Sequence, residues 1–147
     1  MNRPRKIRSG HLERLAIVYV RQSSMEQATA KSAETQRCLA DVAQKWGWPE
    51  SRILVIEEDQ GLSGTSSENR PGFRRMLGHL QRGEVGVVFV RDVTRLSRDP
   101  VDGKRFLRAA MRARILLYVN DRLQNIAMEF AALSGLFDGW QSRGRGR

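Results

Sequence analysis

The sequence predicts an α/β domain in which a largely parallel central sheet is flanked by helices on both faces. Two observations support this prediction. The chain has 147 residues, which is the size of one domain with its own core. Short runs rich in β-branched residues alternate with longer helical patterns, and parallel strands need crossover helices of this kind. We therefore expect one compact unit around a single sheet.

Four segments have the composition of β-strands, and they are Leu15–Val20, Arg52–Ile56, Val85–Val90 and Ile115–Val119. The first and the third of them are of the type that is buried on both faces. The apolar runs in them have at most six residues, whereas a membrane-spanning helix needs about 20. We therefore expect no transmembrane helix and a cytoplasmic protein.

Three segments between these strands have helical patterns. The first extends from about Ser32 to Trp46 and is followed by a glycine, a frequent helix stop. The second begins at Pro71, because proline suits the first turn of a helix, and ends at Gly83. The third extends from Pro100 to about Ala113. These crossovers predict a sheet that is covered on both faces.

The formal net charge is +10, and most of the excess lies at the ends of the chain. Residues 1–14 carry +4 and residues 142–147 carry +3, which leaves +3 for the rest. Neither end interleaves large apolar residues with its charges, so the pattern favours a nucleic acid over a membrane as partner. A solubilising tail is the alternative. We expect 1–14 to be a flexible basic extension and 141–147 a disordered basic tail.

Cysteine and histidine content argues against a metal centre. One cysteine, Cys38, cannot form an intrachain disulfide, and with the well-separated His11 and His79 it cannot build a Cys/His zinc site. No Gly-x-Gly-x-x-Gly follows the first strand, which disfavours a Rossmann-like nucleotide-binding protein. We therefore expect neither a metal nor a nucleotide cofactor. Cys38 itself is expected to be a small buried residue of the first helix.

Polar segments follow the first three predicted strands, at residues 21–24, 57–64 and 91–98. The carboxyl ends of parallel strands meet at one edge of a sheet, where binding sites of α/β proteins lie. Three segments that are distant in sequence should therefore converge. The sequence predicts a functional site at this edge.

Arginine and serine residues dominate two of these segments, which form one cluster at 21–24 and a second at 91–98 with Arg95 and Arg98 three residues apart. Arg21 and Ser23 are two residues apart where a strand ends, so their side chains can point to the same side. Guanidinium groups match phosphate oxygens and stay charged, and several of them can stabilise a phosphoryl transition state. A solvated basic surface is the alternative for either cluster alone. Two clusters at one sheet edge favour a phosphate site.

The chain resembles the catalytic domain of the serine recombinases, the resolvase/invertase family. The resemblance extends from about residue 15 to 119 and rests on five motifs in order, which are residues Tyr19–Gln27, Glu34–Gln36, Asp59–Gly64, Asn69–Phe73 and Thr94–Asp99. It implies a domain that cuts double-stranded DNA with a serine and holds the 5′ end as a phosphoserine ester. It also implies strand exchange in a tetramer formed from homodimers, with no metal and no nucleotide cofactor.

The resemblance implies roles for individual residues. Ser23 corresponds to the nucleophile. The arginines implied around the scissile phosphate are Arg21, Arg70, Arg95 and Arg98. The implied supporting polar positions are Gln27, Gln36, Asp59 and Thr94.

Thr94 and Ser24 affect the assignment of the general base and of the nucleophile. Many relatives have an aspartate at the position of Thr94, and a hydroxyl cannot act as a carboxylate base. The general base is therefore unassigned. Ser24 competes with Ser23 for the role of nucleophile, but strand alternation would point it away from Arg21.

Residues 125–140 have the pattern of a strongly apolar helix. Large apolar residues recur at steps of three and four, and Glu129 and Asp138 are the charged residues of the segment. This helix either packs on its own domain or, as the resemblance implies, forms a subunit interface after a catalytic domain of residues 15–124. Seven residues follow it, so we expect a catalytic domain without a DNA-recognition region.

Two functional hypotheses follow from these observations. The first is an active catalytic domain of a serine recombinase. The alternative is a non-catalytic relative that acts as a dimerisation or regulatory DNA-binding module. Trapping of a covalent protein–DNA adduct distinguishes them.

Overall fold

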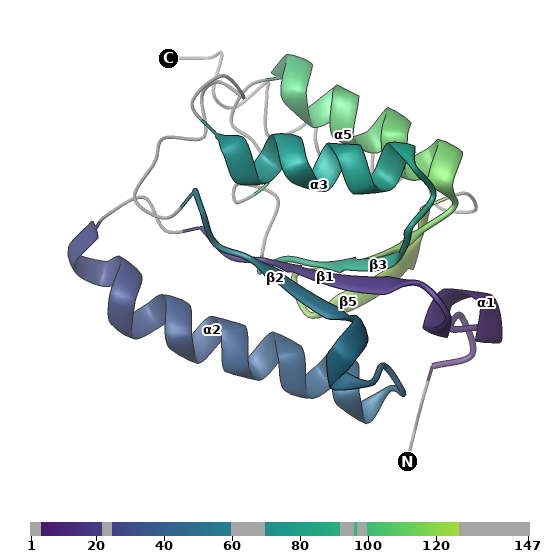
Figure 1. Ribbon diagram of the computed structural model, residues 1–147, viewed down its shortest axis with the longest axis horizontal. Helices are drawn as coiled ribbons and strands as arrows, with labels where there is room; N and C mark the ends of the chain where they lie inside the picture. The colour runs from purple at the N-terminus through teal and green to yellow at the C-terminus, as the bar shows by residue number, and fades with distance from the viewer. Residues whose placement is uncertain (1–3, 22–24, 60–69, 92–95, 97–99, 127–147) are drawn as a thin grey trace.

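The computed structural model describes residues 4–21, 25–59, 70–91, 96 and 100–126 (Figure 1). In chain order its elements are α1 (Ser9–Leu12), β1 (Leu15–Tyr19), α2 (Met25–Lys45), the 3-10 turn η1 (Glu50–Arg52), β2 (Ile53–Ile56), α3 (Pro71–Gln81), β3 (Val85–Phe89), α5 (Pro100–Ala113), β4 (Leu116–Val119) and β5 (Arg122–Asn125). Among the described helices, none combines the length and apolar character that crossing a bilayer requires.

The five strands form one sheet in the order β2-β1-β3-β4-β5. Strands β1 to β4 are parallel, and β5 pairs antiparallel with β4. Helix α2 covers one face, and α3 and α5 cover the other (Figure 1). This arrangement confirms the predicted α/β fold with a mostly parallel sheet between helices.

Strand alternation divides the core into two layers. In β1, Ile17 and Tyr19 point into the layer beneath α3 and α5. Ala16 and Val18 point into the layer beneath α2. All five residues of β3 are buried, because both of its faces are covered. The aliphatic runs of β1, β3 and β4 are thus the inner strands of the sheet, whereas the run of β2 lies at its edge and is mostly half-buried.

The last strand, β5, differs from the sequence prediction. Asn120 and Asp121 have positive φ angles of 54° and 60° and form a tight turn, which returns the chain antiparallel to β4. Asn125, predicted as the first residue of the interface helix, is instead the last residue of β5. Ile126 is described and buried, and the part of the predicted helix from residue 127 onward lies outside the described residues. The tail at 141–147 lies outside them as well.

Helix α2 is longer than its sequence pattern indicates. It begins at Met25, seven residues before the predicted start at Ser32. Cys38, expected to be buried on this helix, is exposed. The helix packs through Leu39 and Ala43 instead. The prediction for Cys38 was therefore wrong, because the apolar side of the helix runs through the neighbouring residue.

The N-terminal residues 4–14 are not the flexible extension that their charge indicates. Ile7 is buried in the α2 layer of the core, and the Lys6 Nζ donates to the Leu123 carbonyl at 2.9 Å. Helix α1 lies so close to β3 that a Cβ on Gly86 would be 2.2 Å from the His11 carbonyl oxygen. This segment is part of the folded domain.

His11 is buried in this segment, and its Nδ1 accepts the Arg8 backbone N–H at 2.9 Å. Burial, and then the positive charges of Arg14 and Arg8, lower the pKa of His11 from its usual 6.5. His11 therefore binds a proton more weakly in the folded chain than in the unfolded chain. We expect the free energy of unfolding to fall as the pH drops from about 7.5 to about 5.5, and the His11→Asn variant to lose part of this dependence. Urea unfolding at both pH values measures it, and equal slopes in the two proteins would contradict the assignment.

Candidate active site

The candidate site lies at the carboxyl ends of three neighbouring strands. Arg21 follows β1, Asp59 follows β2 and Arg91 follows β3, each within three residues of the strand end. Strands β2, β1 and β3 are adjacent in the sheet and parallel to one another. The described residues of the three polar segments, at 21, 57–59 and 91, therefore lie at one edge, as predicted.

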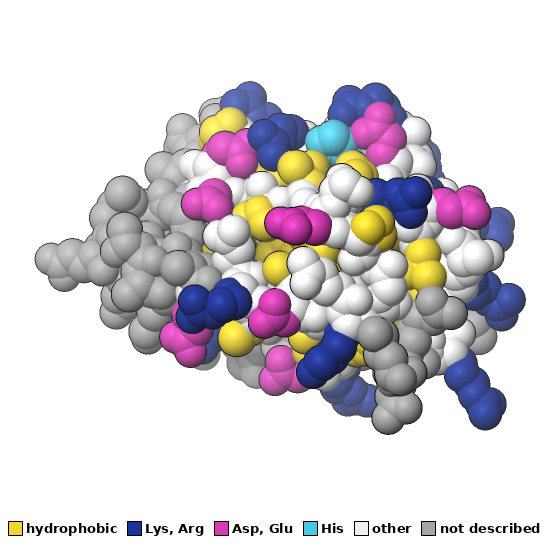
Figure 2. All heavy atoms as spheres, turned by 60° about the horizontal axis from the view of Figure 1, so that its bottom comes forward, with side chains coloured by type: hydrophobic (Ala, Val, Ile, Leu, Met, Phe, Trp, Pro, Cys, Tyr) yellow, Lys and Arg dark blue, Asp and Glu magenta, His cyan; other side chains and the backbone are white. Residues whose placement is uncertain are grey.

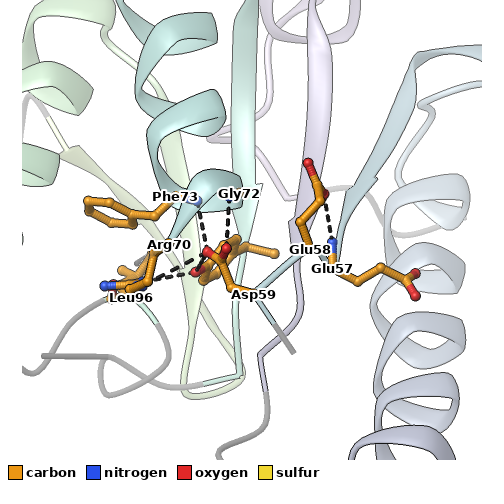
Figure 3. Close-up of polar contacts among 8 residues, drawn as sticks. Glu57, Glu58, Asp59, Arg70, Gly72, Phe73 and Leu96 are labelled. Carbon is orange, nitrogen blue, oxygen red and sulfur yellow. Dashed lines mark hydrogen bonds and ion pairs between the residues drawn. The ribbon is translucent and has the colours of Figure 1, made fainter. Parts of the chain in front are cut away.

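Asp59 connects this edge to the start of α3 (Figure 3). Its side chain is fully buried, and its two carboxylate oxygens accept the backbone N–H groups of Gly72 and Phe73, both at 2.8 Å. The Tyr19 hydroxyl donates to Asp59 Oδ2 at 2.5 Å. These two N–H groups belong to the first turn of α3, where backbone donors have no partner within the helix and a negative charge is stabilised. Asp59 therefore caps α3 from the loop after β2.

Arg70 lies at the centre of the same cluster and is also fully buried. Its Nη2 donates to the Tyr19 hydroxyl at 2.9 Å and to the Leu96 carbonyl. Its Nε is 3.9 Å from Asp59 Oδ2, and its guanidinium carbon is 4.2 Å from the centre of the Phe73 ring. One side chain thus connects β1, the loop after β2, the start of α3 and the segment after β3 (Figure 3).

The Arg70-Pro-Gly-Phe73 motif forms this arrangement locally. Arg70 is the N-cap residue of α3, and Pro71 occupies the first helical position, where its missing N–H has no cost. A Cβ on Gly72 would be 2.8 Å from Ile56 Cγ2 and 3.1 Å from the Asp59 carboxyl carbon, so glycine is needed for this approach. Phe73 contributes both its N–H to Asp59 and its ring face to Arg70.

The cluster brings the opposite charges of Asp59 and Arg70 together in a buried environment. Buried charges are tolerated when an opposite charge and hydrogen bonds compensate for lost water, and Asp59 has both. Burial is the main cause that raises the pKa of Tyr19 well above its usual value, with a further contribution from Asp59 against the opposing effect of Arg70. The Tyr19 hydroxyl therefore keeps its proton and donates a hydrogen bond to Asp59.

The structure brings together only some of the predicted site residues. Arg21 is 2% exposed at the same edge, and Asp59 and Arg70 are in direct contact. Gln36 is half-buried on α2. Gln27 also belongs to α2, in a part of the helix where only the backbone is described. The predicted residues that lie outside the described ranges are Ser23, Thr94, Arg95 and Arg98.

Sequence reasoning missed Tyr19 and the Leu96 carbonyl as members of the cluster. Tyr19 had a signal, because it is a hydroxyl at the end of an otherwise aliphatic buried strand, and buried tyrosine hydroxyls need a hydrogen-bond partner. Leu96 had none, since its contribution is a backbone group. Within the described ranges, no three His, Cys, Asp or Glu side chains gather closely enough to hold a metal ion.

Comparison with protein families and known sequences gives two matches. The family model described as "Resolvase, N terminal domain" matches residues 16–136. A curated relative, the uncharacterized protein y4bA/y4pH of Sinorhizobium fredii, is 38% identical over 130 residues. This match covers 80% of the chain but 19% of the relative, so the chain spans about a fifth of that protein.

Several solved structures have a similar fold, among them the following three. The N-terminal catalytic domain of TP901-1 integrase has a TM-score of 0.67 at 22% identity and covers 89% of this chain and 96% of its own. The C-terminal catalytic domain of ISC1926 TnpA, an IS607-like serine recombinase, has a TM-score of 0.61 at 18% identity, covering 80% and 78%. A resolvase family site-specific recombinase from Streptococcus pneumoniae has a TM-score of 0.58 at 22% identity, covering 88% and 89%.

Proposed function

The chain belongs to the resolvase family of site-specific recombinases, and from this premise we propose that it cuts and rejoins double-stranded DNA through a covalent phosphoserine intermediate. Ser23 is the proposed nucleophile. Arg21, Arg95 and Arg98 are the proposed phosphate ligands. The domain division into residues 15–124 and an interface helix at 125–140, with homodimers and exchange tetramers, forms part of the same proposal.

One observation carries most of the support. Arg70 and Asp59 are fully buried at the sheet edge that also holds Arg21. A charged pair of this kind is costly to bury and contributes little net stability. Its presence indicates that the side chains at this sheet edge must be held in a defined arrangement. The pair connects residues that follow β2 and β3, the strands on either side of β1, and β1 precedes Ser23 in the sequence. This is the arrangement expected around a phosphoryl-transfer site.

The proposed reaction conserves the phosphodiester bond. The Ser23 oxygen attacks phosphorus, the bond from phosphorus to the 3′ oxygen breaks, and the DNA 5′ end remains on serine as a phosphodiester. The serine proton leaves to a base and the 3′ oxygen gains a proton. Guanidinium groups stabilise the negative charge of the five-coordinate transition state. Attack of a 3′ hydroxyl on the phosphoserine then restores DNA and frees Ser23.

Arg70 takes a different role in this proposal from the one the resemblance implies. Its guanidinium is enclosed by Tyr19, Asp59, Phe73 and the Leu96 carbonyl. Leu96 lies between Arg95 and Arg98 in the sequence. We therefore assign Arg70 as a positioning residue, which acts on the arginine pair through the Leu96 carbonyl.

Tyr19→Phe tests this positioning cluster. The change removes one hydroxyl that bridges two charged groups, so we expect the free energy of unfolding to fall by about 1–3 kcal/mol. We also expect the single-turnover cleavage rate to fall by roughly tenfold with little change in DNA affinity, because the phosphate ligands remain. Tyr118→Phe, on the opposite face of the sheet, is the matched control. An unchanged cleavage rate in Tyr19→Phe would contradict the positioning role.

The proposed activity is tested by trapping the covalent intermediate. The full chain is incubated with a pool of nicked duplexes, in which cleavage releases a short strand and blocks rejoining, and the products are separated under denaturing conditions. We expect a slower-migrating protein–DNA adduct that forms equally in EDTA. Absence of an adduct across the pool would favour the non-catalytic alternative, and dependence on Mg²⁺ would indicate a nuclease.

A further inference from the structure

The two helical layers of the protein differ in charge. Helix α2 contains three basic and three acidic residues. Helices α3 and α5 together contain six lysines and arginines and one acidic residue, Asp102. Figure 2, which turns the α2 side forward, shows acidic and basic side chains interspersed there. Of these three helices, α3 and α5 therefore carry the excess of positive charge, and α2 carries none.

Within this side, α5 carries a row of cations. Lys104, Arg108 and Arg112 are exposed and follow one another at intervals of four residues, which places them on one face of the helix over about 12 Å. Within the described part of the chain, none of the three has an acidic partner. Arg105 lies beside them, and its Nη1 is 3.7 Å from Asp102 Oδ1. We call these four residues the α5 basic stripe.

The stripe borders a groove rather than a flat surface. A hollow of about 520 Å³ lies between α5 and the end of α3, and all four stripe residues line it. Leu80, Ala109 and the 62% exposed Val101 contribute apolar surface to the same hollow. Concave surfaces with one sign of charge and apolar walls concentrate the electrostatic potential. Four like charges held together in this way favour a ligand with several negative charges.

We propose that the α5 basic stripe binds the phosphate backbone of double-stranded DNA, as a second contact region outside the cleavage site. Three of its four residues are arginine, whose guanidinium matches phosphate oxygens. Duplex DNA has a charge every 1.7 Å or so along its axis, so several phosphates fall within the length of the stripe. Helix α5 begins directly after the segment at 91–98 of the candidate site and runs away from it. The inference rests on the proposed function, since that function supplies the duplex.

This contact holds the duplex without reading its sequence. Phosphate contacts fix position and carry no base information. The stripe should therefore contribute equally to all duplexes, and its contribution should weaken steeply as salt displaces the phosphate contacts. Binding to uncut DNA of arbitrary sequence is the appropriate readout, because it does not depend on cleavage.

The test compares two double variants of the full chain that lose the same charge. Arg108→Gln with Arg112→Gln removes half of the stripe, and Arg37→Gln with Lys45→Gln removes two exposed cations of α2 as the matched control. Fluorescence anisotropy with an intact duplex is measured between about 50 and 200 mM salt. We expect the slope of log affinity against log salt to become shallower by about 1.8 in the stripe variant and to stay unchanged in the control.

Three results would overturn the inference. Equal loss of affinity in both variants would show an effect of net charge alone. If the stripe variant binds DNA as tightly as the wild type does, the duplex is not the ligand of the stripe. If that variant also loses self-association in sedimentation, the groove binds a protein partner instead. The proposed function fails separately, because a wild-type chain that forms no adduct can still show stripe-dependent binding.

Discussion

Ser23→Ala is expected to abolish the covalent protein–DNA adduct completely. The change removes the attacking oxygen and little else, so the folded structure and the affinity for uncut duplex should stay close to those of the wild type. Loss of a nucleophile cannot be compensated by the arginines, because they stabilise charge and form no bond to phosphorus. Adduct formation on the nicked duplex pool measures the effect.

Ser24→Ala is the matched control for this prediction. It removes a hydroxyl from the next residue, with the same change in side-chain size, and it should retain adduct formation. Thermal unfolding of both variants verifies that each is folded. An active Ser23→Ala protein, or an inactive Ser24→Ala protein of normal stability, would reverse the assignment of the nucleophile.

Arg70→Ala is expected to have the second largest effect. It leaves the Asp59 carboxylate buried without its cation, and breaking a buried pair in this way costs about 3–5 kcal/mol. We also expect cleavage to slow by orders of magnitude, because the Leu96 carbonyl, which lies between the proposed phosphate ligands Arg95 and Arg98 in the sequence, loses its donor. Denaturant unfolding and single-turnover cleavage, both at a temperature where the variant is folded, measure the two effects.

Arg75→Ala is the control for Arg70→Ala. Arg75 is also on α3, but it is exposed and pairs with Glu58 at 2.8 Å, so its loss should cost at most about 1 kcal/mol. Arg70→Lys should not restore cleavage, since one ammonium cannot donate to Tyr19 and Leu96 and also place a planar group over the Phe73 ring.

A paired variant distinguishes positioning from stability. Asp59→Asn combined with Arg70→Gln removes both buried charges, so it should recover part of the stability that Arg70→Ala loses. Cleavage should remain slow in this variant, because the donor to Leu96 is altered. Recovery of cleavage together with stability would mean that Arg70 acts only through the fold.

The parallel sheet was predictable because its inner strands have an unambiguous composition. The run at Val85–Val90 is aliphatic on both faces, and a segment of that length and type has few alternatives to a buried parallel strand. The last strand was not predictable in this way. Its residues, Arg122 to Asn125, lie at the sheet edge with one apolar side chain, so they lack the pattern that marks a strand.

The N-terminal segment shows where charge is a poor guide to structure. Five basic residues in 1–14 indicate a solvated end, yet Ile7 and His11 are buried and the Lys6 Nζ donates to a carbonyl of β5. A few isolated buried side chains are a weak signal in a sequence. Whether such a side chain is buried depends on the surface that the sheet and α2 offer it in the folded protein.

The candidate site was predictable in its location but not in its internal contacts. The carboxyl ends of parallel strands follow from topology, so Arg21, Asp59 and Arg91 were placed at one edge correctly. That Arg70 contacts Tyr19, Asp59 and Leu96 inside the protein depends on all three being within reach at once. Such a juxtaposition exists only in three dimensions.

The identity of the residue that carries the DNA tests the central claim most directly. The trapped adduct is digested with nuclease and then with trypsin, which cuts after Arg21 and after Lys31 and leaves residues 22–31 as one peptide. Fragmentation in the mass spectrometer then locates the attached nucleotide within it. The account predicts a nucleotide joined through its 5′ phosphate to Ser23. A nucleotide on Ser24, on a residue outside this peptide, or joined through its 3′ phosphate would contradict the account.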